Sequence, residues 1–350
     1  MKVALVGFRG SGKTTVFNAL TGQSAETGFG KKGSSNLGRI QVPDERIDKL
    51  TAIYQPKKTT RAEIQFVDVA GPEDAERGAA SGLDPALVAL IREADALVHV
   101  VRGFDNPMLE GGPRPAADLA GFDDELVLTD NVQVEKRIER LRKEKKGPEL
   151  ELMEKLLGLL EEGKALRRHT FAAEELHTMS GFGFLSMKPV LCVLNQGEDE
   201  IGSPAPDDVV AAAKERDVDL ISMCATMEAE IMAMEPDDQA AFLADYGLSE
   251  PMRSRFIAAA YGLLDLISFL TSGEDEVRAW TIRRGTNARN AAGKIHSDLE
   301  RGFIRAEVTA YDDFIALGSE AKVKEAGKLR LEGKDYIVQD GDIMHVRHNS

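Results

Sequence analysis

Short apolar runs recur along the first two-thirds of the chain, and the segments between them carry helical patterns. Runs of strand length lie at residues 2–6, 63–68, 95–101, 189–194 and 218–223. Continuous apolar runs of this length that alternate with helical segments are typical of parallel strands covered by helices on both faces. The pattern therefore predicts an α/β fold with a doubly wound, mostly parallel sheet.

The gap between the third and fourth runs is too long for one crossover and holds two charged helical segments. In residues 126–146 and 149–168, apolar side chains recur at helical spacing among Glu, Arg and Lys, and Gly147-Pro148 forms a break between them. We expect a helical hairpin over 126–186, inserted between two parts of the sheet domain, 1–125 and 187–277. A solvated structural arm and a partner-binding arm explain the pattern equally well.

The last part of the chain, residues 278–350, has a different pattern that predicts a compact α+β domain. Strands are expected at 277–282, 303–309, 328–331, 336–338 and 343–346, and helices at 287–296 and 311–317.

Composition narrows the class of protein. Hydrophobic residues make up 43% and charged residues 29% of the chain, as in ordinary globular proteins. Cys192 and Cys224 are the two cysteines, too few for a disulfide scaffold, so a reducing, cytoplasmic compartment is expected. The net charge of −15 disfavours broad binding to DNA or to a membrane, but it leaves room for a local RNA contact.

The strongest chemical signal follows the first apolar run. Residues 7–14 read Gly-Phe-Arg-Gly-Ser-Gly-Lys-Thr, which is the P-loop pattern, with a strand before it and a helix after it. The glycines let backbone N–H groups surround a phosphate, and the helix adds its positive N-terminal end. We expect Lys13 to reach the β- and γ-phosphates and Thr14 to bind Mg²⁺. The predicted phosphate-binding residues are Arg9, Gly10, Ser11, Gly12, Lys13, Thr14 and Thr15.

A second motif, Asp-Val-Ala-Gly at residues 68–71, ends the next strand. There Asp68 can hold the Mg²⁺ through water, and the N–H of Gly71 can sense the γ-phosphate. Together with Lys13 these residues form the predicted catalytic set, and Thr14 with Asp68 the predicted metal site. Many GTPases place a water-orienting Gln after this glycine, but this chain has Pro72, which predicts slow intrinsic hydrolysis.

The nucleotide base would be read after the fourth and fifth strands. Residues 195–198 are Asn-Gln-Gly-Glu where GTPases usually have Asn-Lys-x-Asp. The longer Glu198 would crowd guanine, so Asn195 and Glu198 favour ATP. Asp199, one residue on, keeps GTP open as the alternative, and a plain loop is the third interpretation. Backbone N–H groups at Cys224 and Ala225 would complete the base site.

Separate blocks of the sequence, in order, resemble the YchF-type Obg-like ATPase family. The blocks are residues 7–14, 42–46, 66–71, 195–198, 276–282, 291–296, 300–307 and 336–342. The resemblance implies a P-loop switch that favours ATP over GTP and associates with ribosomes. It also implies a coiled-coil insertion and a C-terminal TGS domain, a small β-grasp-like module. The family carries a hydrophobic residue at the position of Pro72.

The chain departs from the family pattern at the switches. The family P-loop usually reads Gly-x-Pro-Asn-Val-Gly-Lys-Ser-Thr, and Arg9 is an unusual residue in it that could touch phosphate. The first switch normally carries a Thr that completes the Mg²⁺ shell. In this chain Lys31 or Lys32 lies near the position of that Thr, and the hydroxyl of Ser34 or Ser35 could replace the Thr as a Mg²⁺ ligand. The second switch is replaced by Pro-Glu-Asp-Ala-Glu at residues 72–76.

These features predict a Mg²⁺-dependent ATP-binding and hydrolysing switch whose partner is the ribosome or a ribosome-associated factor. ATP and Mg²⁺ would order residues 28–38 and 71–82, and hydrolysis would release them. Two alternatives remain open: a GTPase that uses Asp199, and a nucleotide-gated binding protein with little or no turnover.

Overall fold

The structure, a computed structural model, describes residues 1–23, 25, 35–69, 83–144 and 147–349. Contacts divide the chain into two units. The first unit comprises Met1–Ile40 and Gln65–Leu263, and the second comprises Gln41–Ile64 and Leu264–Ser350. None of the described helices combines the length and apolar character needed to cross a bilayer.

The first unit is built on one sheet with the strand order β2-β4-β1-β5-β6-β7. Its strands are β1 (Lys2–Val6), β2 (Ser35–Gln41), β4 (Glu63–Val69), β5 (Ala96–Gly103), β6 (Val190–Gln196) and β7 (Asp219–Met223). Strand β1 pairs in parallel with β4 on one side and β5 on the other, and β6 pairs in parallel with β5 and β7. All five predicted strands are present, and β2 is an additional one that the sequence pattern did not predict.

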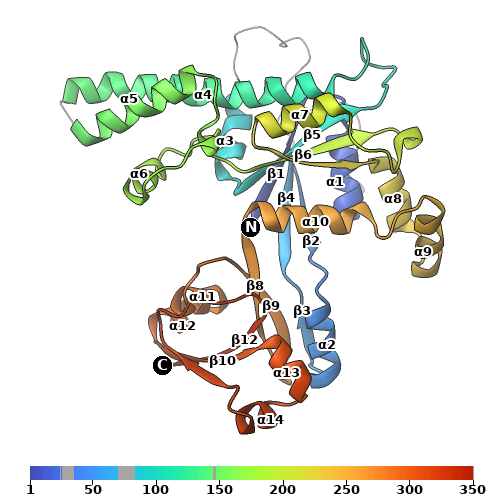
Figure 1. The fold of residues 1–350 in the computed structure, drawn as a ribbon, viewed down its shortest axis with the longest axis vertical. Coiled ribbons are helices and arrows are strands. Elements are labelled where there is room, and N and C mark those ends of the chain that lie inside the picture. The colour runs from blue at the N-terminus through green and yellow to red at the C-terminus, as the bar shows by residue number, and fades with distance from the viewer. Residues whose placement is uncertain (24, 26–34, 70–82, 145–146, 350) are drawn as a thin grey trace. The chain divides into compact units, whose positions relative to one another are not determined.

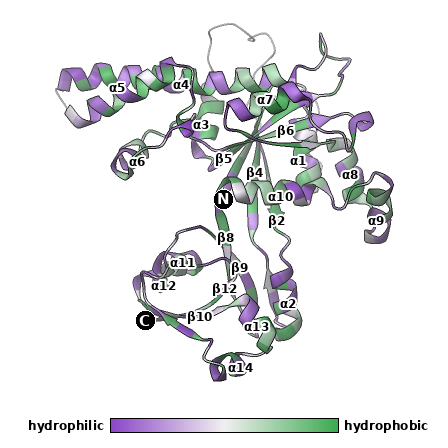
Figure 2. Cartoon of the chain, viewed as in Figure 1, coloured by the Kyte–Doolittle hydropathy of each residue, from purple (hydrophilic) through white to green (hydrophobic). Residues whose placement is uncertain are grey.

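Helices cover both faces of this sheet (Figure 1). They include α1 (Lys13–Thr21), α3 (Pro85–Glu93), α7 (Asp207–Glu215), α8 (Ala225–Ala233), α9 (Pro236–Asp245) and α10 (Met252–Leu263). A core of buried side chains from β1, β5, β6, α3 and α7 fills one face, and Phe66 of β4 packs on Phe256 of α10. The central strands are hydrophobic because they are buried between these layers (Figure 2).

The inserted hairpin consists of α4 (Pro115–Glu144) and α5 (Gly147–Glu161), which lie side by side (Figure 1). Helix α4 has 30 residues, so it is about 45 Å long. Its first half buries Phe122 and Leu126 in the sheet core, and its second half buries Ile138 and Leu141 against α5. The boundary expected at residue 125 therefore falls inside one continuous helix. A short 3₁₀ turn (Leu166–Arg168) and α6 (Ala173–Met179) lead back to β6.

The second unit has its own sheet with the order β11-β10-β12-β8-β9-β3. Its strands are β3 (Lys58–Thr60), β8 (Leu266–Thr271), β9 (Glu276–Arg283), β10 (Phe303–Ala310), β11 (Arg330–Glu332) and β12 (Asp342–His348). Its helices are α2 (Glu45–Tyr54), α11 (Ala288–Ile295), α12 (Ser297–Arg301), α13 (Tyr311–Leu317) and α14 (Glu320–Glu325).

The extent of this unit differs from the expected 278–350 in two ways. It begins at Leu264, because β8 pairs antiparallel with β9. It also takes in residues 41–64, since β3 pairs with β9 and Arg46 Nη1 donates to Asp340 Oδ2 at 2.9 Å. The strand predicted at 336–338 was wrong: Ile337 makes only an isolated bridge with Asn287.

Candidate nucleotide-binding site

The loop between β1 and α1 has the backbone of a phosphate cradle. Gly7, Gly10 and Gly12 have φ angles of 146°, 75° and 86°, a region that side chains rarely adopt. Gly12 also caps the N-terminus of α1, and a Cβ there would lie 2.2 Å from Nδ2 of Asn195. Glycine is thus required for both conformation and space, and the first-turn N–H groups of α1 are available to an anion.

The P-loop lysine lies in this cradle. Lys13 is only 8% exposed, and its Nζ donates to the carbonyl oxygens of Gly7 at 2.8 Å and Phe8 at 2.9 Å. The cation is therefore held by the loop that is predicted to bind the phosphates. Arg9 and Thr15 flank it, half-buried, in the loop and in α1.

Two predicted metal ligands meet at the carboxyl ends of the strands. The hydroxyl of Thr14 donates to Oδ2 of Asp68 at 3.0 Å, and Asp68 is 5% exposed. Hydroxyl and carboxylate oxygens are the donors that Mg²⁺ prefers, so the pair fits this ion. The sequence interpretation missed Asn36, whose Nδ2 donates to the same Asp68 oxygen at 3.2 Å. The only signal for it would have been its place at the start of β2, beside β4.

Asn195 links three loops at the base-binding edge. Its Nδ2 donates to the carbonyl oxygen of Ser11 at 3.1 Å, and its Oδ1 accepts the N–H of Ala225 at 3.1 Å. Asn195 thus joins the P-loop to the start of α8. This structural role is additional to the contact with the base that the sequence predicts for Asn195.

The side chains of Glu198 and Cys224 both contact the hydroxyl of Thr226. Glu198 is exposed in the 3₁₀ turn Glu198–Glu200, and its Oε1 accepts a long hydrogen bond from Thr226 Oγ1 at 3.4 Å. Buried Cys224 places its Sγ 3.2 Å from the same hydroxyl. The loops after β6 and β7 therefore come together as predicted for a base site, and Asp199 is exposed beside Glu198.

A buried histidine lies beneath the P-loop. His99 of β5 is 2% exposed and packs against Phe8 and Phe122, with ring centroids 6.5 and 4.5 Å away. Burial, helped by the positive charge of Lys13, lowers the pKa of His99 to about 3. Its imidazole is neutral at physiological pH and adds no charge to the cradle.

Family models match both ends of the chain. Residues 2–155 match a family described as a 50S ribosome-binding GTPase, and residues 266–349 match the C-terminal YchF-GTPase family, described as a protein of unknown function (DUF933). A curated relative from Haemophilus ducreyi, named ribosome-binding ATPase YchF, is 42% identical over 361 aligned residues that cover 99% of each chain. The chain belongs to the YchF family.

Other relatives agree with this assignment. The ribosome-binding ATPase YchF of Bacillus subtilis is 40% identical and covers 100% of this chain and 99% of its own. The solved structure of the Schizosaccharomyces pombe YchF GTPase is similar with a TM-score of 0.86 and 30% identity, covering 99% of this chain and 97% of that one. The family resemblance read from the sequence blocks is confirmed, as is an α/β fold of the P-loop GTPase type.

Several predicted residues of this YchF member lie outside the described part of the chain. They are Gly71, Pro72, Lys31, Lys32 and Ser34, together with the whole of 71–82 and most of 28–38. Ser35 is described only as the first residue of β2. The structure thus brings together the residues predicted to bind the phosphates, the metal and the base. Their roles stay predictions, as do those of the switch residues.

Proposed function

We propose that this YchF protein is a Mg²⁺-dependent ATP-binding and hydrolysing switch that acts in the cytoplasm on the ribosome or a ribosome-bound factor. The observation that carries the proposal is the Thr14–Asp68 hydrogen bond of 3.0 Å beside a glycine-shaped cradle that already holds Lys13. Relatives that span the whole chain and are named ribosome-binding ATPases support the choice of nucleotide and partner.

Different residues of the cradle would bind the phosphate oxygens and the metal ion. Lys13 and the backbone N–H groups of residues 10–15 would hold its oxygens, and Thr14 and Asp68 would hold the metal. Mg²⁺, when bound, would neutralise charge on the β- and γ-phosphates. In our proposal Gly71 senses the γ-phosphate, and Pro72 leaves the attacking water without a side-chain partner, so intrinsic turnover is slow.

The arm and the C-terminal module would report the nucleotide state. We infer that the hairpin of α4 and α5, within 126–186, acts as a coiled coil, and that 278–350 is the core of a TGS domain. Of the remaining parts, residues 1–40, 65–125 and 187–263 would form the nucleotide-binding domain, because 41–64 and 264–277 belong to the second unit. The paired apolar faces of α4 and α5 support the first inference, and the C-terminal family match supports the second.

Base preference gives the test of this proposal. We expect ATP with Mg²⁺ to bind at least tenfold more tightly than GTP, about 1.4 kcal/mol. The physical reason is that exposed Glu198 crowds the guanine edge, whereas Asp is the residue that pairs with guanine. Glu198→Asp should reduce the preference for ATP over GTP. Glu161→Asp, the same substitution at an exposed position of the hairpin, should leave that preference unchanged. The measurement is titration with fluorescent ATP and GTP analogues in parallel.

A preference for GTP would instead point to Asp199 and a GTPase, in keeping with the name of the S. pombe structure. Single-turnover hydrolysis separates both enzymes from a nucleotide-gated binding protein. If the wild type hydrolyses ATP no faster than Lys13→Ala while still binding it, the switch has no useful turnover and the enzyme part of the proposal fails.

Asn36 provides a second prediction. Its amide orients Asp68, so Asn36→Ala is expected to weaken Mg²⁺-dependent ATP binding about fivefold, as for loss of one hydrogen bond to a charged group near the surface. The matched control is Asn131→Ala on α4. Affinity is measured with a fluorescent ATP analogue in Mg²⁺ and again in excess chelator. An equal loss in both conditions would show that Asn36 acts on the fold and not on the metal.

A further inference from the structure

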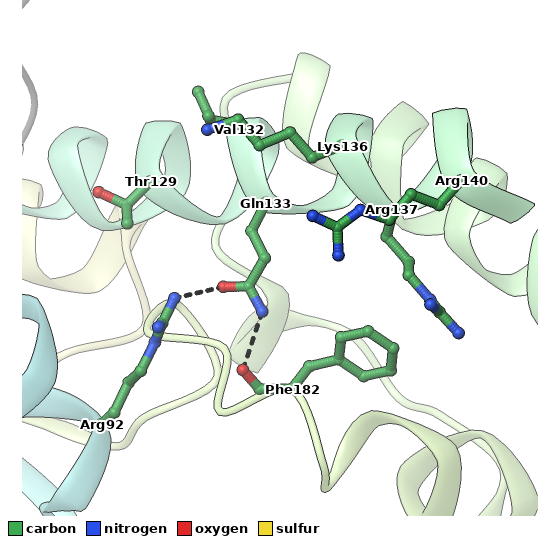
Figure 3. Close-up of a pocket in the computed structure, with 8 residues that line it drawn as sticks. All are labelled: Arg92, Thr129, Val132, Gln133, Lys136, Arg137, Arg140 and Phe182. Atoms are coloured by element: carbon green, nitrogen blue, oxygen red, sulfur yellow. Dashed lines mark hydrogen bonds between the residues drawn. The ribbon is translucent and has the colours of Figure 1, made fainter.

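A groove along α4 is lined by cations, although the chain carries a net charge of −15. The groove has a volume of about 490 Å³. It is lined by Arg92, Thr129, Val132, Gln133, Lys136, Arg137, Arg140 and Phe182 (Figure 3). Half of these side chains are basic and none is acidic. This basic groove runs along the helix for about 16 Å, from Thr129 to Arg140.

One wall of the basic groove is fixed by hydrogen bonds between three elements. Arg92, from α3, donates to Oε1 of Gln133 at 2.6 Å, and Nε2 of Gln133 donates to the carbonyl oxygen of Phe182 at 2.9 Å (Figure 3). Arg137 lies 5.9 Å from the centroid of the Phe182 ring and is ion-paired with Glu149 at 2.7 Å. These contacts give the groove a built aromatic side with a defined shape.

The other two cations have no such role in the fold. Lys136 and Arg140 are exposed, and neither has an ion-pair partner among the residues that the structure describes. They stand four apart on one helix face, where like charges destabilise a helix by a few tenths of a kcal/mol. An anionic ligand in the groove would relieve this repulsion.

The chemistry of the groove favours a peptide over a nucleic acid. Val132, 39% exposed, and the ring of Phe182 offer apolar surface beside the cations, which suits a ligand with both carboxylates and an apolar side chain. The volume of the groove falls within the range of about 300–1,000 Å³ that is usual for pockets that bind small ligands, so a short peptide segment would fit. Double-stranded RNA-binding domains span about 16 base pairs, which is longer than this groove. Single-strand binders stack successive bases on several aromatic side chains, whereas this groove has one, Phe182.

We propose that the basic groove binds a short acidic segment of a partner protein. Carboxylates of the segment pair with Lys136 and Arg140, and an apolar side chain packs on Phe182 and Val132. The site is separate from the P-loop residues, so the proposal goes beyond the nucleotide switch and does not depend on which nucleotide binds.

The test uses the full chain and fluorescence anisotropy of labelled peptides in which Asp and Glu alternate with Phe or Leu. The comparison probes are the same peptides with Lys in place of the acids, and an oligouridine RNA of equal charge. The variant is Lys136→Glu with Arg140→Glu. Its matched control is Lys143→Glu with Lys214→Glu, which makes the same change in net charge at exposed lysines that do not line the groove.

We expect the acidic peptides to bind the wild type and the control alike and to bind the groove variant at least tenfold more weakly. Phe182→Ala should weaken binding of the peptides without altering their salt dependence, because it removes apolar contact only. The proposal is overturned if the acidic peptides bind no better than their Lys counterparts, or if both double variants lose affinity equally. Tighter binding of the RNA, lost in the groove variant, would assign the groove to nucleic acid instead.

Discussion

Lys13→Met is expected to weaken ATP binding by about 100-fold, or roughly 2.7 kcal/mol, without unfolding the protein. The Lys13 ammonium is 8% exposed and already bonded to the cradle carbonyls, so a phosphate would meet a positioned, poorly solvated cation. Methionine keeps an unbranched apolar stem and removes the ammonium group together with its hydrogen bonds to Gly7 and Phe8. Titration with a fluorescent ATP analogue measures the loss.

The matched control for this change is Lys155→Met, an exposed lysine of α5 that pairs with Glu175. Its ATP affinity should equal that of the wild type. Thermal unfolding without nucleotide, measured for all three proteins, separates the loss of ATP binding from any loss of stability, since Lys13→Met also removes the bonds to Gly7 and Phe8. An ATP affinity of Lys13→Met within threefold of the wild type would contradict the placement of the triphosphate on this loop.

Asp130→Ala is expected to lower the free energy of unfolding by about 3 kcal/mol. Asp130 of α4 is 0% exposed and accepts three hydrogen bonds. The donors are the N–H of Leu185 at 2.8 Å, the N–H of Ser186 at 2.7 Å and the Ser186 hydroxyl at 2.6 Å. Alanine leaves all three buried donors unpaired. Denaturant unfolding measures the change, and Glu139→Ala, exposed on the same helix, should be close to neutral.

The same carboxyl gives a pH dependence with a definite sign. Burial raises the pKa of Asp130 above its ordinary value, against the opposing effect of the Ser186 and Leu185 hydrogen bonds. The folded state therefore binds the proton more tightly than the unfolded state does. This contribution to stability is full below the unfolded-state pKa, and it is lost as the pH rises through the folded-state pKa. In Asp130→Ala the free energy of unfolding should no longer show this pH-dependent contribution. If the wild type and Asp130→Ala show parallel dependence of unfolding free energy on pH, the Asp130 carboxyl is not its cause.

The parts of the site that the sequence predicts are those built by local chain geometry. The P-loop needs only a strand, a glycine turn and a helix in succession, so residues 7–14 were sufficient. Asn36 and the linking role of Asn195 depend on contacts 32 and 184 residues away, to Asp68 and Ser11. No periodicity in the sequence reports such pairings, which explains why the contact of Asn36 with Asp68 was not predicted.

The same reasoning explains the errors in the fold. Helix α4 changes its buried environment from the sheet core to α5 without a break in helical spacing, so its start at Pro115 was missed. Residues 336–338 have the apolar content of a strand but pair only through Ile337. A strand needs a partner as well as a propensity, and the partner lies elsewhere in the chain.

The pairing of β3 with β9 joins Thr59 to Val277, two residues 218 positions apart, and sets the order in which the protein can fold during synthesis. At a synthesis rate of about 5–20 residues per second, roughly 10–40 s pass between the synthesis of β3 and that of β9, its partner strand. During that interval Ile47 and Leu50 of α2, 0% exposed in the finished protein, lack the strand against which α2 packs. The nascent chain therefore carries α2 with its apolar face unshielded until β9 (Glu276–Arg283) has been synthesised.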